Sequence, residues 1–139
     1  VRESHDVDIS NSQRAQMAYD SGAEIFVRIH ANGSENSSAN GAMTICPTES
    51  NPYVSALYHD SKRLSASVLD GLTASTGCRK ERVWETDTMS GINWSMIPVT
   101  IVEMGYMTNP EEDTKMADDG YQQLIAIGIA DGIDGYFEE

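Results

Sequence analysis

The sequence predicts an α/β domain of three layers, in which a twisted, mostly parallel mixed sheet is flanked by helices. Two hydrophobic runs, 25–30 and 98–103, have the length and composition of strands. Segments with helical spacing alternate with them, and such alternation favours parallel strands with helices on both faces. No internal repeat or linker interrupts the 139 residues, so residues 1–139 are expected to form one domain.

The first half of the chain supplies a helix, two strands and a long helix. Residues 8–21 read as a helix that stops at Gly22, and the strand 25–30 follows at once. A polar loop over 32–40 leads to a second strand, 41–46. The long helix is expected over 52–76, because apolar residues recur there at helical spacing: Val54, Leu57, Tyr58, Leu64, Val68 and Leu72.

The second half is predicted with less regular structure. Residues 83–88 read as a short extended or irregular piece, and 89–96 as a loop. The strand over 99–103 comes next. Asn109 followed by Pro110 and two glutamates is typical of a helix start, and a last helix is expected over 121–136.

Composition excludes several classes of function. Nine Lys and Arg against 22 Asp and Glu give a net charge of −13, which disfavours nucleic-acid binding and attachment to anionic surfaces. No run is long enough for a membrane span, so membrane insertion is not expected.

Cys46 and Cys78 lack a close Cys-x-x-Cys spacing, and their state is left open between two free thiols and one disulfide. Val1 is not an initiator methionine, and the chain reads as a piece of a longer protein. The oligomeric state is left open.

His30 and Glu103 are the candidate functional residues. Each ends a hydrophobic strand, at the carboxyl-terminal edge where open α/β sheets bind ligands. A histidine there can be a satisfied core residue, and a glutamate there can form an ion pair with Arg28 or Arg14. Burying a carboxylate is costly without a partner or a metal, however, and partial burial raises its pKa towards the range of a general base.

A histidine nitrogen is a good zinc ligand, and zinc lowers the pKa of bound water to about 7, so a neighbouring glutamate could take that water's proton. A catalytic zinc normally has three protein ligands, and His5 and His59 are poor candidates for the others. Serine and cysteine nucleophile motifs are absent. The polar loop that begins at Asn32 and the loop 86–95, with Asn93, are expected to bind substrate; for the second loop, packing is the alternative.

The sequence resembles the zinc-dependent N-acetylmuramoyl-L-alanine amidases along essentially its whole length. The resemblance lies in the order of five segments, which are 2–4, Arg14, 18–24, 26–32 and 98–109. The last two, Phe-Val-Arg-Ile-His-Ala-Asn and Pro-Val-Thr-Ile-Val-Glu-Met-Gly-Tyr-Met-Thr-Asn, are specific in combination.

The resemblance implies a function and a site. Such enzymes cleave the amide between N-acetylmuramic acid and L-alanine in peptidoglycan, so the substrate is expected to be peptidoglycan and the location extracellular or in the cell wall. His30 matches the family's second zinc-binding histidine, and Glu103 matches its catalytic glutamate. The implied cofactor is zinc.

One family motif is missing. The first zinc histidine of the family lies in a Gly-His-Gly-Gly turn after the first strand, and a glutamate ligand follows on the next helix; neither occurs in these 139 residues. We therefore expect the chain to lack that strand and helix, to expose a strand edge, and to be inactive or poorly active by itself. Two alternatives remain: a non-catalytic peptidoglycan-binding or regulatory remnant, and an unrelated hydrolase with a metal-free His30–Glu103 pair.

Overall fold

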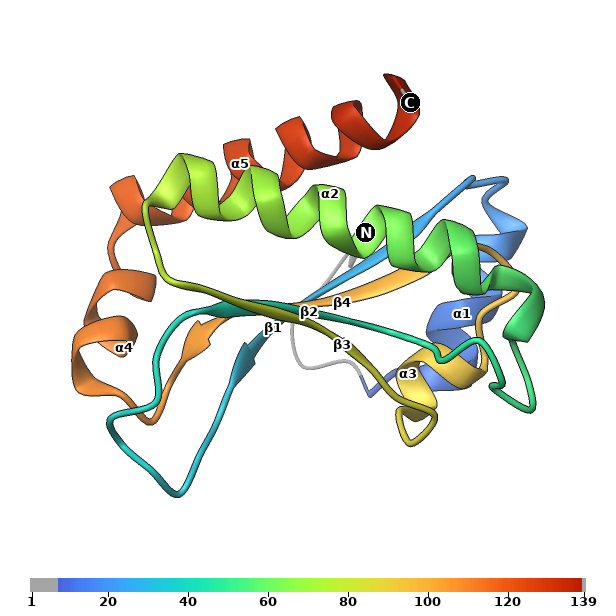
Figure 1. The fold of residues 1–139 in the computed structure, drawn as a ribbon, viewed down its shortest axis with the longest axis horizontal. Coiled ribbons are helices and arrows are strands. Elements are labelled where there is room, and N and C mark those ends of the chain that lie inside the picture. The colour runs from blue at the N-terminus through green and yellow to red at the C-terminus, as the bar shows by residue number, and fades with distance from the viewer. Residues whose placement is uncertain (1–7, 139) are drawn as a thin grey trace.

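The computed structural model describes residues 8–138 (Figure 1). One sheet has the strand order β1-β4-β2-β3, with β1 over Phe26–Asn32, β2 over Ala42–Cys46, β3 over Lys80–Glu85 and β4 over Val99–Tyr106. β1 is parallel to β4 and β2 is parallel to β3, while β2 and β4 are antiparallel. The predicted mixed, mostly parallel sheet with flanking helices is confirmed.

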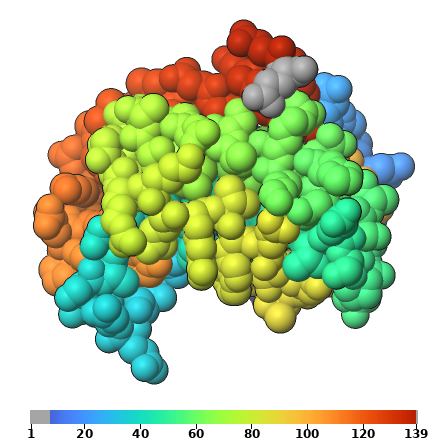
Figure 2. All heavy atoms as spheres, viewed as in Figure 1, coloured from blue at the N-terminus to red at the C-terminus, as the bar shows by residue number. Residues whose placement is uncertain are grey.

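Helices lie on both faces of the sheet. Their bounds are Asn11–Asp20 for α1, Tyr58–Thr76 for α2, Ser90–Asn93 for α3, Pro110–Met116 for α4 and Asp119–Glu138 for α5, and a 3-10 turn, η1, covers Ser55–Leu57. Figure 1 shows α2 and α5 together on one face, and α1 and α3 at one end of the other. The space-filling view shows the loop 33–41 projecting from the opposite end (Figure 2).

Two apolar clusters hold these layers together. The larger lies between the sheet and the helices α2 and α5, and its buried residues are Ala42, Leu64, Val68, Leu69, Leu72, Val102, Ile125, Ile129 and Tyr136. The smaller lies under α3 on the other face and consists of Ile45, Val54, Ile92, Val99 and Ile101. The residues 99–102 of β4 are buried throughout, because the central strand has a cluster on each face.

Helix α5 approaches α2 closely because glycines lie where they cross. A Cβ atom added to Gly71 would lie 2.3 Å from the carbonyl oxygen of Gly128, and one added to Gly132 would lie 2.6 Å from that of Ser67. Both distances are shorter than side chains tolerate, so only glycine permits this approach.

Several predicted boundaries differ from the structure. The predicted helix 52–76 is an η1 turn followed by α2, because the Asn51 side chain accepts from the amides of Tyr53 and Val54 and holds a turn there. Where the sequence predicted an extended or irregular piece over 83–88, the structure has the strand β3, which begins three residues earlier, at Lys80. The loop 89–96 contains the short helix α3. Strand β4 continues past Glu103 to Tyr106.

Candidate functional site

His30 and Glu103 lie side by side on neighbouring strands. β1 and β4 pair residue by residue from Phe26 with Val99 to His30 with Glu103. Paired residues of parallel strands point to the same face of a sheet. That face also carries Arg28 and Ile101, and it is the one opposite α2 and α5. The imidazole and the carboxylate therefore share one face, just before the register shifts between His30 and Asn32.

The Glu103 carboxylate is partly buried without a partner. Its Oε2 atom is inaccessible to solvent and has no hydrogen-bond partner among residues 8–138. Burial raises the pKa of this carboxyl group. The ion-pair alternative does not occur here, because Arg28 donates to Asn11 Oδ1 at 2.8 Å and Arg14 to the carbonyl oxygen of Ile9 at 3.1 Å. Glu103 is thus free to accept a proton or a hydrogen bond from a ligand.

The surroundings of His30 favour the neutral form of its imidazole. Partial burial lowers its pKa, and the charges of Arg28 and Arg14 lower it further. Neutral imidazole is the form that binds metal ions. Within the described chain no hydrogen bond restrains this side chain, so its ring nitrogens are available.

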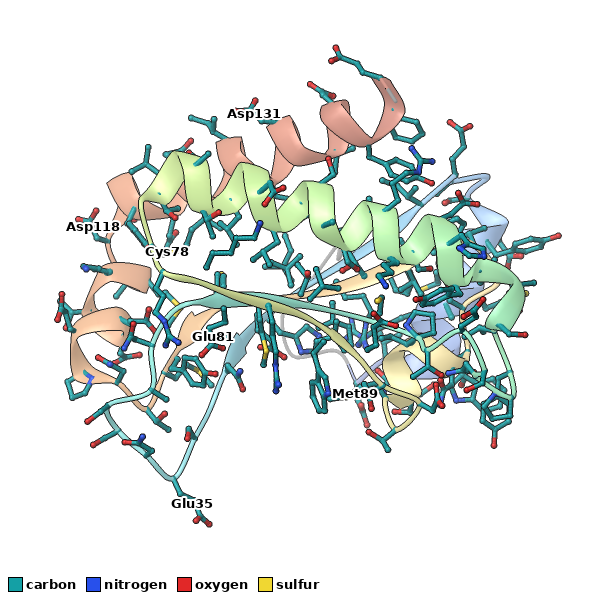
Figure 3. The ribbon with its side chains drawn as sticks, viewed as in Figure 1. Glu35, Cys78, Glu81, Met89, Asp118 and Asp131 are labelled. Atoms are coloured by element: carbon teal, nitrogen blue, oxygen red, sulfur yellow. The ribbon has the colours of Figure 1, made fainter. Side chains whose placement is uncertain are left out.

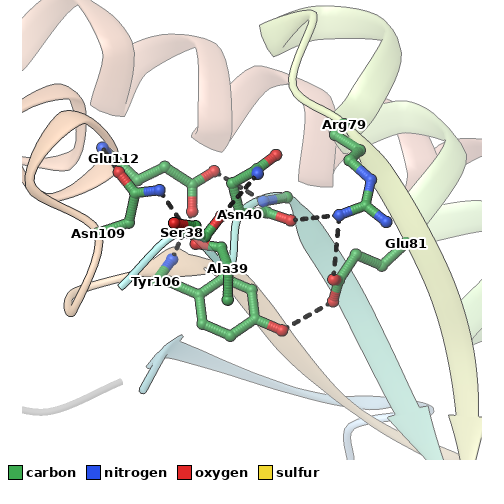
Figure 4. Close-up of polar contacts among 9 residues, drawn as sticks. Ser38, Ala39, Asn40, Arg79, Glu81, Tyr106, Asn109 and Glu112 are labelled. Carbon is green, nitrogen blue, oxygen red and sulfur yellow. Dashed lines mark hydrogen bonds and ion pairs between the residues drawn. The ribbon is translucent and has the colours of Figure 1, made fainter. Parts of the chain in front are cut away.

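The end of β4 is fixed by Glu112 of α4. Its two carboxylate oxygens accept from the amides of Gly41 and Tyr106, each at 2.8 Å (Figure 4). A Cβ on Gly105 would lie 3.2 Å from the Met116 sulfur, so α4 packs closely on the strand directly after Glu103. The sequence indicated only a helix start at this position. The bond from the amide of Gly41, which lies 71 residues from Glu112, has no local signal in the sequence.

The two asparagines expected to bind substrate have contacts within the chain. Asn32 Oδ1 accepts from the amide of Gly33 at 2.8 Å. Asn93 accepts from Asn51 at 2.9 Å and donates to the carbonyl oxygen of Asp87 at 2.7 Å. These contacts join Asn93 to Asn51 and to the backbone of Asp87 within the loop 86–95.

No group of three or more His, Cys, Asp or Glu side chains that could hold a metal ion occurs among residues 8–138. His59 is exposed at the start of α2, against the ring of Tyr58. His5, and the matching segment 2–4, lie outside the described residues. The two cysteines are both free. His30 and Glu103 can therefore supply one nitrogen ligand and one carboxylate, but not a whole three-ligand zinc site.

The outer edge of β1 is open in the described chain. β1 pairs only with β4, and a groove of about 910 Å³ follows it, lined by the strand and by α1. Ile29, on the face towards α5, is 55% exposed. A second, apolar groove of about 430 Å³ lies beside it, between Ile29, Met104 and α5. An edge strand with unpaired backbone groups and apolar neighbours is a place where a further strand can be added.

Comparison with known proteins identifies the class to which this fold and site belong. Residues 1–135 match the Amidase_3 family, described as N-acetylmuramoyl-L-alanine amidase, and the chain belongs to that family. It is 32% identical over 134 residues to N-acetylmuramoyl-L-alanine amidase LytC of Bacillus subtilis (strain 168), an alignment that covers 96% of this chain. The chain spans only 26% of LytC and 35% of the probable cell wall amidase LytH of Staphylococcus aureus.

Solved structures agree with this assignment. The catalytic domain of CwlV, an N-acetylmuramoyl-L-alanine amidase of Bacillus (Paenibacillus) polymyxa var. colistinus, superimposes with a TM-score of 0.81 at 28% identity. An N-acetylmuramoyl-L-alanine amidase of Clostridium difficile 630 gives 0.85 at 27% identity. Each superposition covers 96% of this chain and 68% of the solved one. Between residues 8 and 138 no helix has the length and apolar character that crossing a membrane requires.

Proposed function

We propose that the protein to which this chain belongs hydrolyses the amide bond between N-acetylmuramic acid and L-alanine in peptidoglycan, with zinc as cofactor, outside the cytoplasm or in the cell wall. The observation that carries the proposal is the pairing of His30 with Glu103, whose buried Oε2 has no partner. Membership of the amidase family supports the choice of substrate.

The two side chains fit different parts of this reaction. His30 would hold the zinc ion through a ring nitrogen, and bound zinc supplies an activated water and polarises the scissile carbonyl. Glu103 takes the proton from the attacking water. The raised pKa of its carboxyl group favours the uptake of that proton. The protonated carboxyl group then delivers the proton to the leaving amine of L-alanine. Asn32, two residues after His30 on the same strand, and Asn93 are proposed to contact the substrate.

We further propose that the remaining ligands come from a strand and a helix that precede Val1 and complete the sheet along β1. The open edge and the groove of about 910 Å³ along it support this place for the strand. The apolar groove between Ile29 and α5 supports a second covering element. Residues 1–139 alone would then bind zinc weakly and turn over slowly or not at all.

A second candidate is a non-catalytic peptidoglycan-binding or regulatory domain. The observation that favours it is that residues 8–138 contain no three-ligand cluster. Zinc content separates the two proposals. The catalytic proposal requires about one tightly held zinc ion per molecule once the upstream sequence encoded by the gene is present.

The catalytic proposal is tested with Glu103→Gln in the protein of full encoded length. New alanine amino termini released from purified peptidoglycan measure the reaction, and elemental analysis measures zinc. We expect the variant to lose about 10²- to 10⁴-fold in rate, as removal of a general base does, while it retains its zinc. Glu24→Gln, on an exposed side chain, is the matched control and should leave the rate unchanged. Turnover by Glu103→Gln at the unsubstituted rate would remove Glu103 from the mechanism.

A further inference from the structure

Arg82 lies on the same face of the sheet as Glu103, two strands away. Trp84 of β3 pairs with Ile45 of β2, which pairs with Ile101 of β4, so Trp84 shares the face of Ile101 and Glu103. Arg82 lies in a bulge, directly before the regular pairs Val83–Thr44 and Trp84–Ile45, and it points to the same face as Trp84. Its guanidinium carbon lies 5.6 Å from the Trp84 ring centroid, which fits this orientation.

The charge of Arg82 is not neutralised by the protein. Five cations of the described chain form ion pairs, namely Lys62, Arg63, Arg79, Lys80 and Lys115. Arg14 and Arg28 are held by hydrogen bonds to Ile9 and Asn11. Among residues 8–138, Arg82 is the one arginine or lysine with neither an ion pair nor a hydrogen bond. Its guanidinium is exposed and has no ion pair in a chain of net charge −13, so it is available to an anionic ligand.

The acid beside Arg82 already has other partners. Glu81 accepts from the Tyr106 hydroxyl at 2.8 Å and lies 3.6 Å from Arg79 (Figure 4). Figure 3 shows Glu81 and Met89 on the side of the sheet opposite α2. A bulge lies here, because Lys80 pairs with Ala42 but Val83 pairs with Thr44. The extra residue places both Glu81 and Arg82 opposite Met43, so that Glu81 can be neutralised while Arg82 stays free.

We propose that Arg82, supported by Trp84, binds a free carboxylate on the peptide side of the scissile amide. This inference rests on the proposed amidase function. A guanidinium matches a carboxylate through two parallel hydrogen bonds, and the indole face keeps its plane in a fixed orientation. Adjacent strands lie about 4.8 Å apart, so the backbones at Glu103 and Arg82 are separated by about 10 Å, the length of about three extended residues. A carboxylate within that reach of the cleaved bond belongs to the stem peptide.

Net charge explains why such a residue is needed. A chain with an excess of 13 negative charges repels an acidic peptide, and a local cation next to the catalytic face offsets that repulsion. The alternative occupant of this position is a sugar ring stacked on Trp84, which is uncharged. The two occupants differ in their response to ligand charge, to salt and to the loss of Arg82.

The test compares two ligands that differ by one carboxylate, N-acetylmuramoyl-L-alanyl-D-glutamate with its γ-carboxyl group amidated and the same compound with the α-carboxyl group amidated as well. Binding is measured by tryptophan fluorescence in the Glu103→Gln background, with mass spectrometry to check that each ligand stays intact. We expect the acid to bind about three- to tenfold more tightly than the amide, and this preference to shrink between 0.05 and about 0.5 M salt.

Arg82→Gln should abolish the preference, because it weakens the binding of the acid and leaves the binding of the amide unchanged. Arg82→Lys should retain part of the preference. Lys115→Gln, which removes one charge from the exposed surface of α4, is the matched control and should preserve it. Equal affinity for both ligands in the protein that retains Arg82 would overturn the proposal. An equal loss of affinity for both ligands in Arg82→Gln would also overturn it. Cleavage of the ligand by Glu103→Gln would instead count against the proposed role of Glu103 and leave the charge preference intact.

Discussion

Glu103 and His30 occupy paired positions on two parallel strands, and no described side chain forms a hydrogen bond with either of them. Most buried polar groups in proteins have partners, and exceptions mark places where a ligand or ion is expected. The pair therefore contributes little to the stability of the fold. Its substitution should separate the effects on metal binding from the effects on folding.

The first prediction concerns His30. His30→Ala should lower zinc affinity by at least about tenfold in the protein of full encoded length, because one nitrogen ligand is lost. The midpoint of thermal unfolding, measured in a chelator, should change by less than about 2 °C because the residue is exposed. His59→Ala, on the exposed start of α2, should retain full zinc affinity. Equal zinc affinity in His30→Ala would exclude His30 as a ligand.

The second prediction concerns the crossing of α2 and α5. Gly132→Ala should lower the free energy of unfolding by about 2 kcal/mol or more, because its new methyl group would lie 2.6 Å from backbone atoms of Ser67 and Val68. Gly135→Ala is the matched control on the same helix. Its methyl group meets only the Ser67 hydroxyl oxygen, at 3.1 Å, and alanine favours the helix, so its stability should change by less than about 1 kcal/mol. Urea unfolding followed by circular dichroism measures both, and equal effects would show that the two helices can move apart.

The third prediction concerns Asn51, which is 2% exposed. Its amide donates to Asp87 and Asn93, and its oxygen accepts from the amides of Tyr53 and Val54. Asn51→Ala removes these four hydrogen bonds, one of them to the buried amide of Val54, and should cost about 2–3 kcal/mol in unfolding free energy. Asn36→Ala, in the exposed loop 33–41, serves as the control and should cost less than about 0.5 kcal/mol. A stable Asn51→Ala variant would mean that water replaces this network.

The fourth prediction concerns pH. Hydrogen bonds from Lys62 and Tyr58 lower the pKa of the Glu85 carboxyl group. A lowered folded-state pKa contributes stability above the unfolded value of about 4.3, and this contribution is lost as the pH falls through the folded value. Glu85→Gln should therefore lower the unfolding midpoint by about 1–3 °C at pH 7, and the difference should vanish near pH 3.

The Glu85 prediction has its own check in the partner residue. Lys62→Gln should remove most of the same pH dependence, and the double variant should add little to either single one. A difference between Glu85→Gln and the unsubstituted protein that persists unchanged down to pH 3 would show that the charge of Glu85 is not its cause.

The strands with strong hydrophobic patterns could be predicted from the sequence, and the polar ones could not. Residues 99–102 are apolar or β-branched and buried on both faces, so β4 was evident. β3 begins with Lys80, Glu81 and Arg82, whose charges hide an edge strand, and a four-residue helix such as α3 is too short to show a period.

The candidate site was predictable only in part. His30 and Glu103 each attract notice at a strand end, but their juxtaposition depends on the register of two strands that are more than sixty residues apart in sequence. No local pattern encodes such a register, because it is set when the sheet assembles. The same reason explains why the partners of Asn93 and Glu112 were not foreseen.

The antiparallel pairing of β2 with β4 divides the connections around the sheet into two sets. β1 and β4 run towards the loops 33–41 and 107–109, whereas β2 and β3 run in the opposite direction, towards 47–54 and 86–98. The face that carries His30 and Glu103 is thus bordered at each end by segments that belong to different halves of the sheet. Insertions into the connections at one border can change that border without disturbing the other, so the two ends of this face can vary independently.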